Sequence, residues 1–300
     1  MTSSAEHLLL DPVHLHRIQD FSLLARVVVD GAMPGVHKSL KQGRGNEFYQ
    51  YRPYTIGEDL KSVDWKVFAK RDELVSKTYQ EDSNFSVCLV IDASASMGYK
   101  GKKASCSKLH YAKMLAACFA YLASRQGDRI GLFAYSDDLK EWIRPRSGSA
   151  NLNQVFNSLQ NLESKGVDRH EFAWDRMITA LPGRALVVFL SDFLEAEYTL
   201  SQKLRFSLSA KYDMLCVQVL DPDEMDLPEM DSVRFVELEG EREVSSSPPS
   251  LRESFRDDMS SFVNDLESKL TALSSAFESL LTNQDLGHAL RRYLGVRNRK

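Results

Sequence analysis

From residue 85 onward, short apolar runs alternate with segments whose apolar residues recur about every 3.6 positions. Such alternation predicts parallel strands joined by right-handed helical crossovers, with helices on both faces of the sheet. The expected fold class is therefore α/β, a doubly wound and mainly parallel sheet. The predicted strands are 85–91, 128–135, a shorter and more polar 139–145, 185–190 and 213–220, and the predicted helices are 109–122, 150–162, 171–181 and 196–210.

The C-terminal part of this pattern departs from simple alternation. Residues 233–244 centre on Glu-Gly-Glu and predict a hairpin at the sheet edge. After the polar break SSSPPS, the spacing predicts a long amphipathic helix over 250–272. A last strand at 276–282 and a closing helix at 285–294 complete the predicted unit.

The N-terminal part has a different pattern. Apolar positions between 13 and 29 predict one amphipathic helix that ends before Gly31. Residues 43–80 are aromatic-rich and punctuated by turns, which predicts short strands. We therefore expect two parts, an N-terminal helix with a small β-rich appendage over 1–84 and the α/β domain over 85–300.

Composition adds limits on partners and location. The chain has 300 residues, 43% of them hydrophobic and 27% charged, with a formal net charge of −4, as is usual for a soluble globular protein. Its basic residues are scattered, which argues against nucleic acid as the main partner. Neither a signal peptide nor a long apolar span is evident, so we expect a cytoplasmic protein without a membrane span.

The four cysteines fit a reducing compartment. No two of them are spaced as CxxC, and Cys88, Cys118 and Cys216 lie in apolar segments that predict burial. Cys106, in the polar segment KKASCSK, is the one thiol that we expect to be exposed.

A polar cluster directly follows the first predicted strand of the α/β domain. Asp92, Ser94 and Ser96 lie within DASAS, and Asp192 follows the apolar run of a later strand. Carboxyl ends of parallel strands meet at one edge, so Asp92 and Asp192 are expected to face the same point. Carboxylate and hydroxyl oxygens suit Mg²⁺ or Mn²⁺. The alternative is that these side chains only cap the next helix and satisfy amides at the strand end.

The pattern D-x-S-x-S, with an Asp after a later strand, resembles the metal-ion-dependent adhesion site (MIDAS) of von Willebrand factor type A domains, which have a Rossmann-like fold. The resemblance implies that Ser94 and Ser96 contact the metal directly, while Asp92 and Asp192 act mainly through water. A partner's carboxylate would then complete the shell.

The complete type A site also takes a threonine from the loop after the second crossover. This chain has RSGSANLNQVF there, with Ala150 at the threonine's place and Ser147 or Ser149 as substitutes. The substitution implies weak metal affinity or a site that holds none. We include Ser149 in the expected metal set.

The segment GRGNEFYQYRPYTIGEDLKSVDWKVFAKRDEL is similar to the signature of the DUF58 family. That resemblance implies a non-catalytic interaction module, an adaptor or co-chaperone of a MoxR-type AAA+ ATPase that also contacts protein clients. The matching residues are Gly43, Gly45, Glu47, Phe48, Arg52, Tyr54, Gly57, Asp59, Asp64 and Trp65.

Two rival functions remain open. One is a metal-dependent hydrolase that uses Asp92 and Asp192, which needs His110 or His170 to fold inward as a base. The other is a metal-free scaffold. The templates for phosphate loops, nucleophile elbows and HExxH helices do not occur in the sequence.

Two charged segments have simpler explanations. Residues 221–226, DPDEMD, lack the glycine and the glutamate of a calcium loop, so we expect a solvated loop there. Glu47, Arg52, Asp59 and Asp64 could be catalytic, but their spacing among aromatic residues favours bonds that pin the β-appendage to the main domain.

Overall fold

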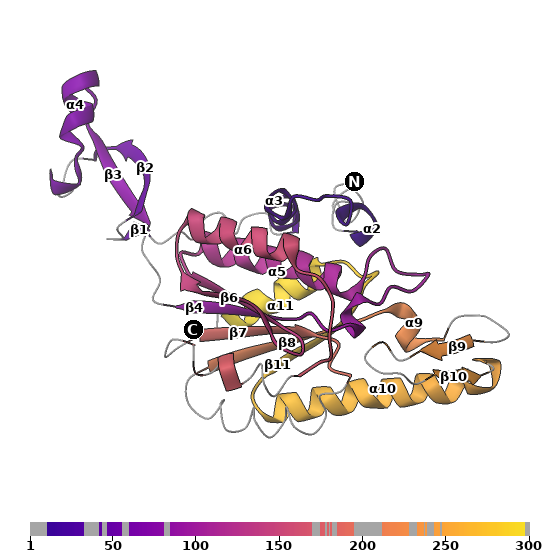
Figure 1. Ribbon diagram of the computed structural model, residues 1–300. Helices are drawn as coiled ribbons and strands as arrows, with labels where there is room; N and C mark the ends of the chain where they lie inside the picture. Colours follow the sequence, from indigo (N-terminus) through magenta and orange to yellow (C-terminus); the bar gives the residue numbers. More distant parts are fainter. Residues whose placement is uncertain are drawn as a thin grey trace.

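The chain folds around a six-stranded sheet, seen edge-on in the computed structural model of Figure 1. The residues that the structure describes are 11–32, 42–43, 47–55, 60–80, 85–169, 175–177, 179, 181, 185–194, 212–227, 233–236, 238, 243–246 and 248–297.

The sheet has the strand order β11-β8-β7-β4-β5-β6. All neighbours pair in parallel except β6, which runs antiparallel to β5 at one edge. This arrangement confirms the expected doubly wound and mainly parallel α/β fold. The strands are β4 (Ser86–Asp92), β5 (Arg129–Tyr135), β6 (Leu139–Arg146), β7 (Ala185–Ser191), β8 (Tyr212–Leu220) and β11 (Ala276–Leu281).

The central strands are apolar because both of their faces are covered. Every residue of β4 and β7 is buried. Leu89 and Ile91 of β4 point into one hydrophobic cluster, whereas Cys88 and Val90 point into another. Side chains alternate between the two faces of a strand, so a continuous apolar run serves both clusters at once.

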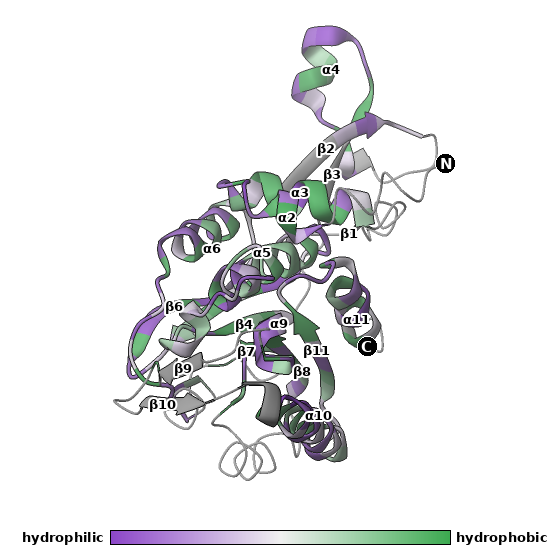
Figure 2. Ribbon diagram, turned by 90° about the vertical axis from the view of Figure 1, so that its right-hand side faces the viewer, coloured by the Kyte–Doolittle hydropathy of each residue, from purple (hydrophilic) through white to green (hydrophobic). Residues whose placement is uncertain are grey.

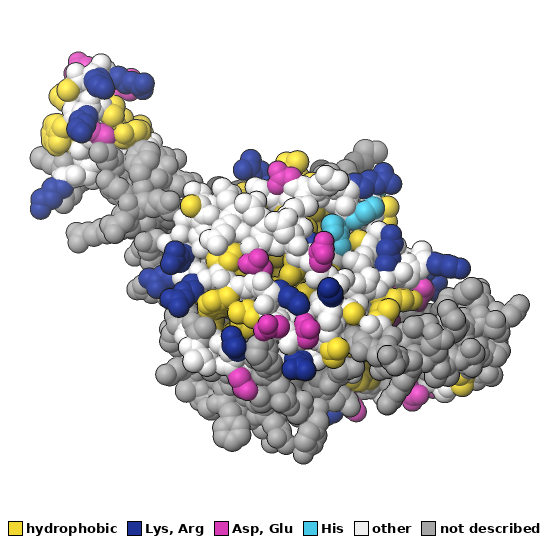
Figure 3. Space-filling model, in the orientation of Figure 1, with side chains coloured by type: hydrophobic (Ala, Val, Ile, Leu, Met, Phe, Trp, Pro, Cys, Tyr) yellow, Lys and Arg dark blue, Asp and Glu magenta, His cyan; other side chains and the backbone are white. Residues whose placement is uncertain are grey.

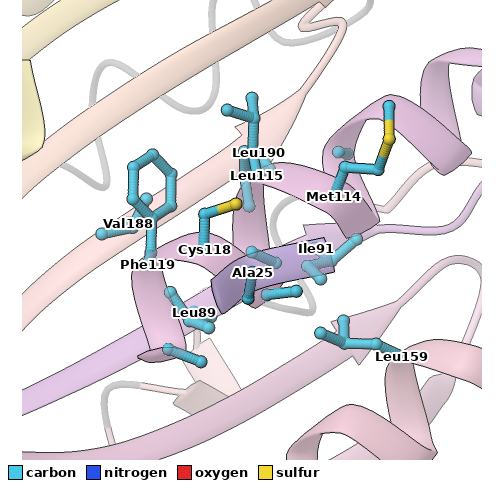
Figure 4. Packing of buried hydrophobic residues seen from close by; sticks show 14 of the residues in the cluster. Ala25, Leu89, Ile91, Met114, Leu115, Cys118, Phe119, Leu159, Val188 and Leu190 are labelled. Atoms are coloured by element: carbon cyan, nitrogen blue, oxygen red, sulfur yellow. The ribbon is translucent and has the colours of Figure 1, made fainter. Parts of the chain in front are cut away.

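One face of the sheet is covered by α5, α6 and α11, and α3 packs over α5. Figure 4 shows apolar side chains of α3, α5 and α6 packed together with those of β4 and β7. The central helix is α5, and it is apolar on nearly all sides because α3, α6 and α11 surround it. Lys113 of α5 donates to the carbonyl oxygens of Leu162 (2.8 Å) and Gln160 (3.3 Å), which ties it to the end of α6. The helices are α3 (Phe21–Ala32), α5 (Lys108–Arg125), α6 (Ser149–Asn161) and α11 (Gly287–Arg297).

The opposite face is covered by α10 (Pro248–Ala272), which confirms the long helix predicted there. Its buried Leu266 and Leu270 join the cluster of Cys88 and Val90. Figure 2 shows that α10 carries both hydrophilic and hydrophobic residues, as expected for a helix with one face on a sheet. Strand β11 and helix α11 likewise form where the sequence predicts them.

The predicted helix over 13–29 is in fact two helices, α2 (Pro12–Leu15) and α3. Asp20 separates them, since its carboxylate accepts hydrogen bonds from the backbone of Ser22 (2.8 Å) and Leu23 (3.2 Å) at the start of α3. Helix α3 continues through Gly31 and packs against α5. It therefore shares the main hydrophobic cluster rather than lying with the β-rich segment.

The β-rich segment forms a small sheet of its own, with the strand order β1-β3-β2. Figure 1 shows this sheet and helix α4 projecting from the main body, as the expected appendage. The position of a domain boundary at residue 84 stays a prediction. The elements are β1 (Gln42–Gly43), β2 (Glu47–Pro53), β3 (Val75–Gln80), the 3₁₀ turn Leu60–Ser62 and α4 (Trp65–Arg71).

The predicted hairpin near the C-terminus forms, but not at the edge of the main sheet. Strands β9 (Val233–Val236) and β10 (Glu243–Ser246) pair antiparallel in a separate two-stranded sheet. The helix predicted over 196–210 lies outside the described residues, and most of the one predicted over 171–181 does too.

The expectation that Cys106 is exposed is wrong. Its side chain is only 6% exposed, and burial raises the pKa of its thiol to about 12. The two ends of the surrounding polar segment are joined where the Lys108 N–H donates to the Tyr99 carbonyl (3.1 Å), so a polar neighbourhood in the sequence did not mean exposure. Among the described residues, no helix combines the length and apolar character needed to cross a bilayer.

Candidate functional site

The polar cluster lies at the carboxyl ends of β4 and β7, which are adjacent in the sheet. Asp92, the last residue of β4, is fully buried. One carboxylate oxygen accepts the backbone N–H of Ser94 (2.9 Å), and the other accepts the hydroxyl of Ser191 at the end of β7 (2.7 Å). Ser191 Oγ in turn accepts the backbone N–H of Phe193 (3.0 Å). Asp92 thus fixes the start of its own loop to the neighbouring strand end.

The structure brings the predicted Ser94, Ser96 and Asp192 together. The hydroxyls of Ser94 and Ser96 lie 3.1 Å apart, and that of Ser96 donates to Asp192 Oδ2 over 2.8 Å. Asp192 is 2% exposed, and its Oδ1 accepts the backbone N–H of Leu194 (3.2 Å). Gln218 of β8 holds the Asp192 carbonyl (2.9 Å), so three adjacent strands position this carboxylate.

Lys108 is a buried charged residue of this cluster that the sequence analysis missed. It is the first residue of α5, and its side chain is fully buried. Its ammonium donates to Asp192 Oδ2 over 2.7 Å and to Glu224 Oε1 over 2.5 Å. The sequence carries one signal for it. Ser107 is a good N-cap, which places Lys108 in the first turn of a helix, where a cation is opposed by the helix dipole and is therefore unusual.

The three charged groups shift one another's proton affinity. Burial lowers the pKa of the Lys108 ammonium, but the adjacent Asp192 and Glu224 carboxylates outweigh burial and raise it above its usual value. Burial raises the pKa of Asp192, yet Lys108 and the Ser96 hydroxyl bring it below the usual value. For Glu224 burial dominates, so its pKa is raised. Lys108 forms ion pairs with both carboxylates, Asp192 at 2.7 Å and Glu224 at 2.5 Å.

The end of β8 is also part of this edge, through the short helix α9 (Pro222–Met225). The Asp221 carboxylate caps this helix by accepting the backbone N–H of Asp223 (2.9 Å). The Glu224 carboxylate in turn accepts the backbone N–H of Asp221 (2.8 Å). The carboxylates of Asp221 and Asp223 also accept the backbone N–H groups of Gly101 (2.8 Å) and Lys102 (3.1 Å). The expected solvated loop at 221–226 is therefore wrong, since Asp221 is fully buried and Asp223 is 6% exposed.

The structure also corrects the assignment of Ser149. Strand β6 runs antiparallel, so its end at Arg146 pairs with Ile130 at the amino end of β5. Ser149, which begins α6 there, is exposed. It lies on the side of the sheet where the parallel strands begin, whereas Asp92 lies on the side where they end.

The segment that does reach the DASAS loop follows α6. Lys165 N–H donates to the Ala93 carbonyl, and Ala95 N–H donates to the Gly166 carbonyl, both over 2.8 Å. The Ser164 hydroxyl of this segment lies close to Gly98, since a Cβ built on Gly98 would meet Ser164 Oγ. Helix α6 is what carries the chain back across the sheet to this edge.

The described side chains do not fit a divalent metal ion in this arrangement. Asp192 Oδ2 already binds an ammonium and a hydroxyl, and the two oxygens of Asp92 accept hydrogen bonds from Ser94 and Ser191. Across the part of the chain that the structure describes, no three histidine, cysteine, aspartate or glutamate residues gather as a ligand group. Binding of Mg²⁺ or Mn²⁺ stays a prediction.

The histidines proposed as a base also lie elsewhere. His110 packs against Phe21 of α3, with the ring centroids 5.9 Å apart, on the side of α5 that faces α3. Burial, together with Lys113 and His16, lowers its pKa to about 4. His170 lies outside the described residues.

In the appendage, Asp64 has a local structural role. Its carboxylate accepts the Tyr51 hydroxyl (2.9 Å) and the backbone N–H of Lys66 (2.9 Å), which caps α4 and joins it to β2. Asp59 and the side chain of Glu47 lie outside the described residues. The predicted bonds that would pin this layer to the main domain stay a prediction. Figure 3 shows hydrophobic and basic side chains together on this projecting unit, where Trp65 is 56% exposed.

Comparison with solved structures finds proteins with similar α/β architecture. BatB from Bacteroides thetaiotaomicron is 13% identical, with a TM-score of 0.48 over 72% of this chain and 100% of that chain. A von Willebrand factor type A protein from Catenulispora acidiphila is 14% identical, with a TM-score of 0.43 over 74% of this chain and 44% of that chain. The fold assignment rests on the strand order of this chain itself.

Sequence comparison gives the family. The chain is 25% identical over 293 residues to the uncharacterized proteins Rv1480 of Mycobacterium tuberculosis and Mb1516 of Mycobacterium bovis, covering 96% of this chain and 91% of each relative. The family model described as "Protein of unknown function DUF58" matches residues 50–262. Since that match covers well over half of the chain, the protein belongs to the DUF58 family.

Proposed function

We propose that this protein is a protein-interaction module and that it docks partners at the carboxyl edge of its sheet. The observation that carries the proposal is the interlocked set of loops at that edge. Three strand ends and the loop at 99–107 are joined by hydrogen bonds of Asp92, Asp192 and Asp221. Ligand sites of open α/β sheets lie beyond the carboxyl ends of the strands, and a rigid edge reduces the entropy lost on binding.

The chemistry of the edge favours an acidic partner surface. Lys100, Lys102 and Lys103 are all exposed on the loop at 99–107, while the backbone of that loop is held by Asp221 and Asp223. The loop therefore presents three ammonium groups from a fixed backbone. Opposite charges across an interface raise the association rate and set orientation.

The resemblance to DUF58 proteins extends the proposal to one partner. We infer that the partner is a MoxR-type AAA+ ATPase, for which this protein acts as an adaptor or co-chaperone toward protein clients. This assignment rests on the family resemblance, whereas the acidic contact surface rests on the lysine loop. A cytoplasmic location would fit such a partner.

The direct test measures binding to the purified ATPase by biolayer interferometry. In the edge variant, Lys100, Lys102 and Lys103 become Glu. In the matched variant, Lys66, Lys70 and Arg71 of α4 become Glu, so the same charge change falls on the appendage. We expect the edge variant to bind much more weakly and to lose the salt dependence of association. Loss confined to the α4 variant would move the docking surface to the appendage.

The same assay distinguishes a metal-dependent contact from one that the protein makes without metal. If Mg²⁺ or Mn²⁺ held by Asp92, Ser94, Ser96 and Asp192 formed the contact, EDTA would abolish binding and Mg²⁺ would restore it. Binding that is equal in EDTA and in Mg²⁺ would support a contact made by the protein alone.

A further inference from the structure

Lys108 occupies an unusual position for a lysine. Its side chain is fully buried although it begins α5, and its ammonium lies 2.7 Å from Asp192 Oδ2 and 2.5 Å from Glu224 Oε1. Lysine side chains usually extend along the protein surface and keep the ammonium in water.

Two physical effects oppose this placement. Removing an ammonium from water is costly, and the positive end of the helix dipole disfavours a cation in the first turn. An apolar side chain would avoid both costs. Two carboxylates offset these costs, that of Asp192 just after β7 and that of Glu224 in α9.

The ammonium also shares an oxygen with the DASAS loop. Asp192 Oδ2 accepts both Lys108 Nζ and the hydroxyl of Ser96, and Ser96 in turn lies 3.1 Å from the hydroxyl of Ser94. Lys108 therefore neutralises the same carboxylate that would face a metal ion held by the two serines. A divalent cation placed there would meet the ammonium charge directly.

We propose that the ammonium of Lys108 takes the place of a divalent metal ion at this edge. It neutralises Asp192, keeps the Ser96 hydroxyl oriented, and holds α9 to the edge through Glu224. The site is then independent of metal, because its cation is part of the chain. The inference concerns the same edge as the proposed docking function, but its tests use no partner, so either can fail while the other stands.

The first experiment is calorimetric titration of Mg²⁺ and Mn²⁺ into the metal-stripped full chain, with thermal unfolding in EDTA and in MgCl₂. We expect no saturable binding and the same midpoint in both solutions. Saturable binding that raises the midpoint and is lost in Asp192→Asn would overturn the proposal.

The second experiment compares Lys108→Met with Lys103→Met, which removes an exposed lysine of the loop that precedes α5. We expect Lys108→Met to unfold at a clearly lower temperature than Lys103→Met and to bind Mn²⁺, since the freed carboxylates then face each other. A Lys108→Met protein that is as stable as the control, or that binds no Mn²⁺, would contradict the replacement.

If Lys108→Met does not fold, the wild-type chain still tests the proposal. Brief acetylation with acetic anhydride, read by peptide mass spectrometry, should modify Lys100, Lys102 and Lys103 at least about tenfold faster than Lys108, because a buried amine reacts only after local opening. Equal rates at all four lysines would show that the ammonium is not enclosed.

Discussion

Ser191 donates its hydroxyl hydrogen to Asp92 Oδ2 over 2.7 Å and so joins the ends of β7 and β4, 99 residues apart in the chain. Both side chains are fully buried. The bond explains why β4 can end in an acid inside the core, since the charge is met by hydrogen-bond donors rather than by water.

Removing this hydroxyl should destabilise the fold. Ser191→Ala removes a buried hydrogen-bond donor to Asp92 Oδ2, which we expect to lower the free energy of unfolding by about 1–3 kcal/mol. Urea denaturation followed by circular dichroism measures the change. Ser254→Ala removes an exposed hydroxyl from α10 and should change stability by less than about 0.5 kcal/mol. Equal effects of the two substitutions would count against a structural role for Ser191.

Lys108 and Asp192 should show strong energetic coupling. Lys108→Met leaves the buried carboxylate of Asp192 and the partly exposed one of Glu224 without their cation, so we expect a loss of about 3–5 kcal/mol in the free energy of unfolding. In Lys108→Met with Asp192→Asn, one of these charges is also absent, so the double variant should be more stable than additivity predicts. Additive losses in a urea double-mutant cycle would show that the two groups do not act as a pair.

Gly101 is required because the loop at 99–107 passes close to the side chains of Asp221 and Asp223. A Cβ at this position would collide with the carboxylates of Asp221 and Asp223, which are held in place by α9. We expect Gly101→Ala to lower the unfolding midpoint and to raise proteolysis within 99–107, because the loop can no longer reach α9. Gly295→Ala is the matched control, since its Cβ meets nothing within 4 Å. On a helix that control should be neutral or stabilising by about 0.5–1 kcal/mol.

His110 should make stability fall on mild acidification. Its folded pKa is lowered to about 4 by burial, Lys113 and His16, whereas an unfolded histidine titrates near 6.5. Between these values the unfolded chain binds more protons, so the free energy of unfolding falls as pH drops from 6.5 to 4. Allowing for its partial exposure, we expect about 1–2 kcal/mol over this window. Its contribution is constant above pH 6.5.

Urea denaturation at several pH values tests this expectation, with His110→Gln as the variant. The slope between pH 6.5 and 4 should be smaller in His110→Gln. The control is His288→Gln, whose ring is 63% exposed beside Glu278. An unchanged slope in His110→Gln would assign the pH dependence to other groups.

The sheet could be predicted from sequence because its signal is local. Runs such as the one around Leu89 and Val90 are apolar on both faces, and each lies between turn residues, so strand positions follow from a few residues at a time. The placement of Asp92 and Asp192 at the ends of neighbouring strands also followed, since parallel strands place their carboxyl ends on one side of the sheet. That their carboxylates face a common metal ion stays a prediction.

Other features depend on relationships that no short segment carries. The polarity pattern of β6 is the same whether it runs parallel or antiparallel, so Ser149 was placed at the wrong edge. Lys108 lies in a segment that resembles a solvated loop, and only contacts with Asp192 and Glu224, 84 and 116 residues further along, explain its burial. Cys106, two residues before Lys108, is buried in the main hydrophobic cluster.

The packing of α3 against α5 bears on how the chain is made. Phe21, Leu24 and Val28 are buried in the finished protein, but α5 follows α3 in the chain and so leaves the ribosome later. During synthesis the nascent chain thus exposes an apolar helix until residue 125 has emerged, a period in which it is open to chaperones and to misassociation. Completion of α5, rather than of α3 itself, marks the point at which the apolar face of α3 can become buried.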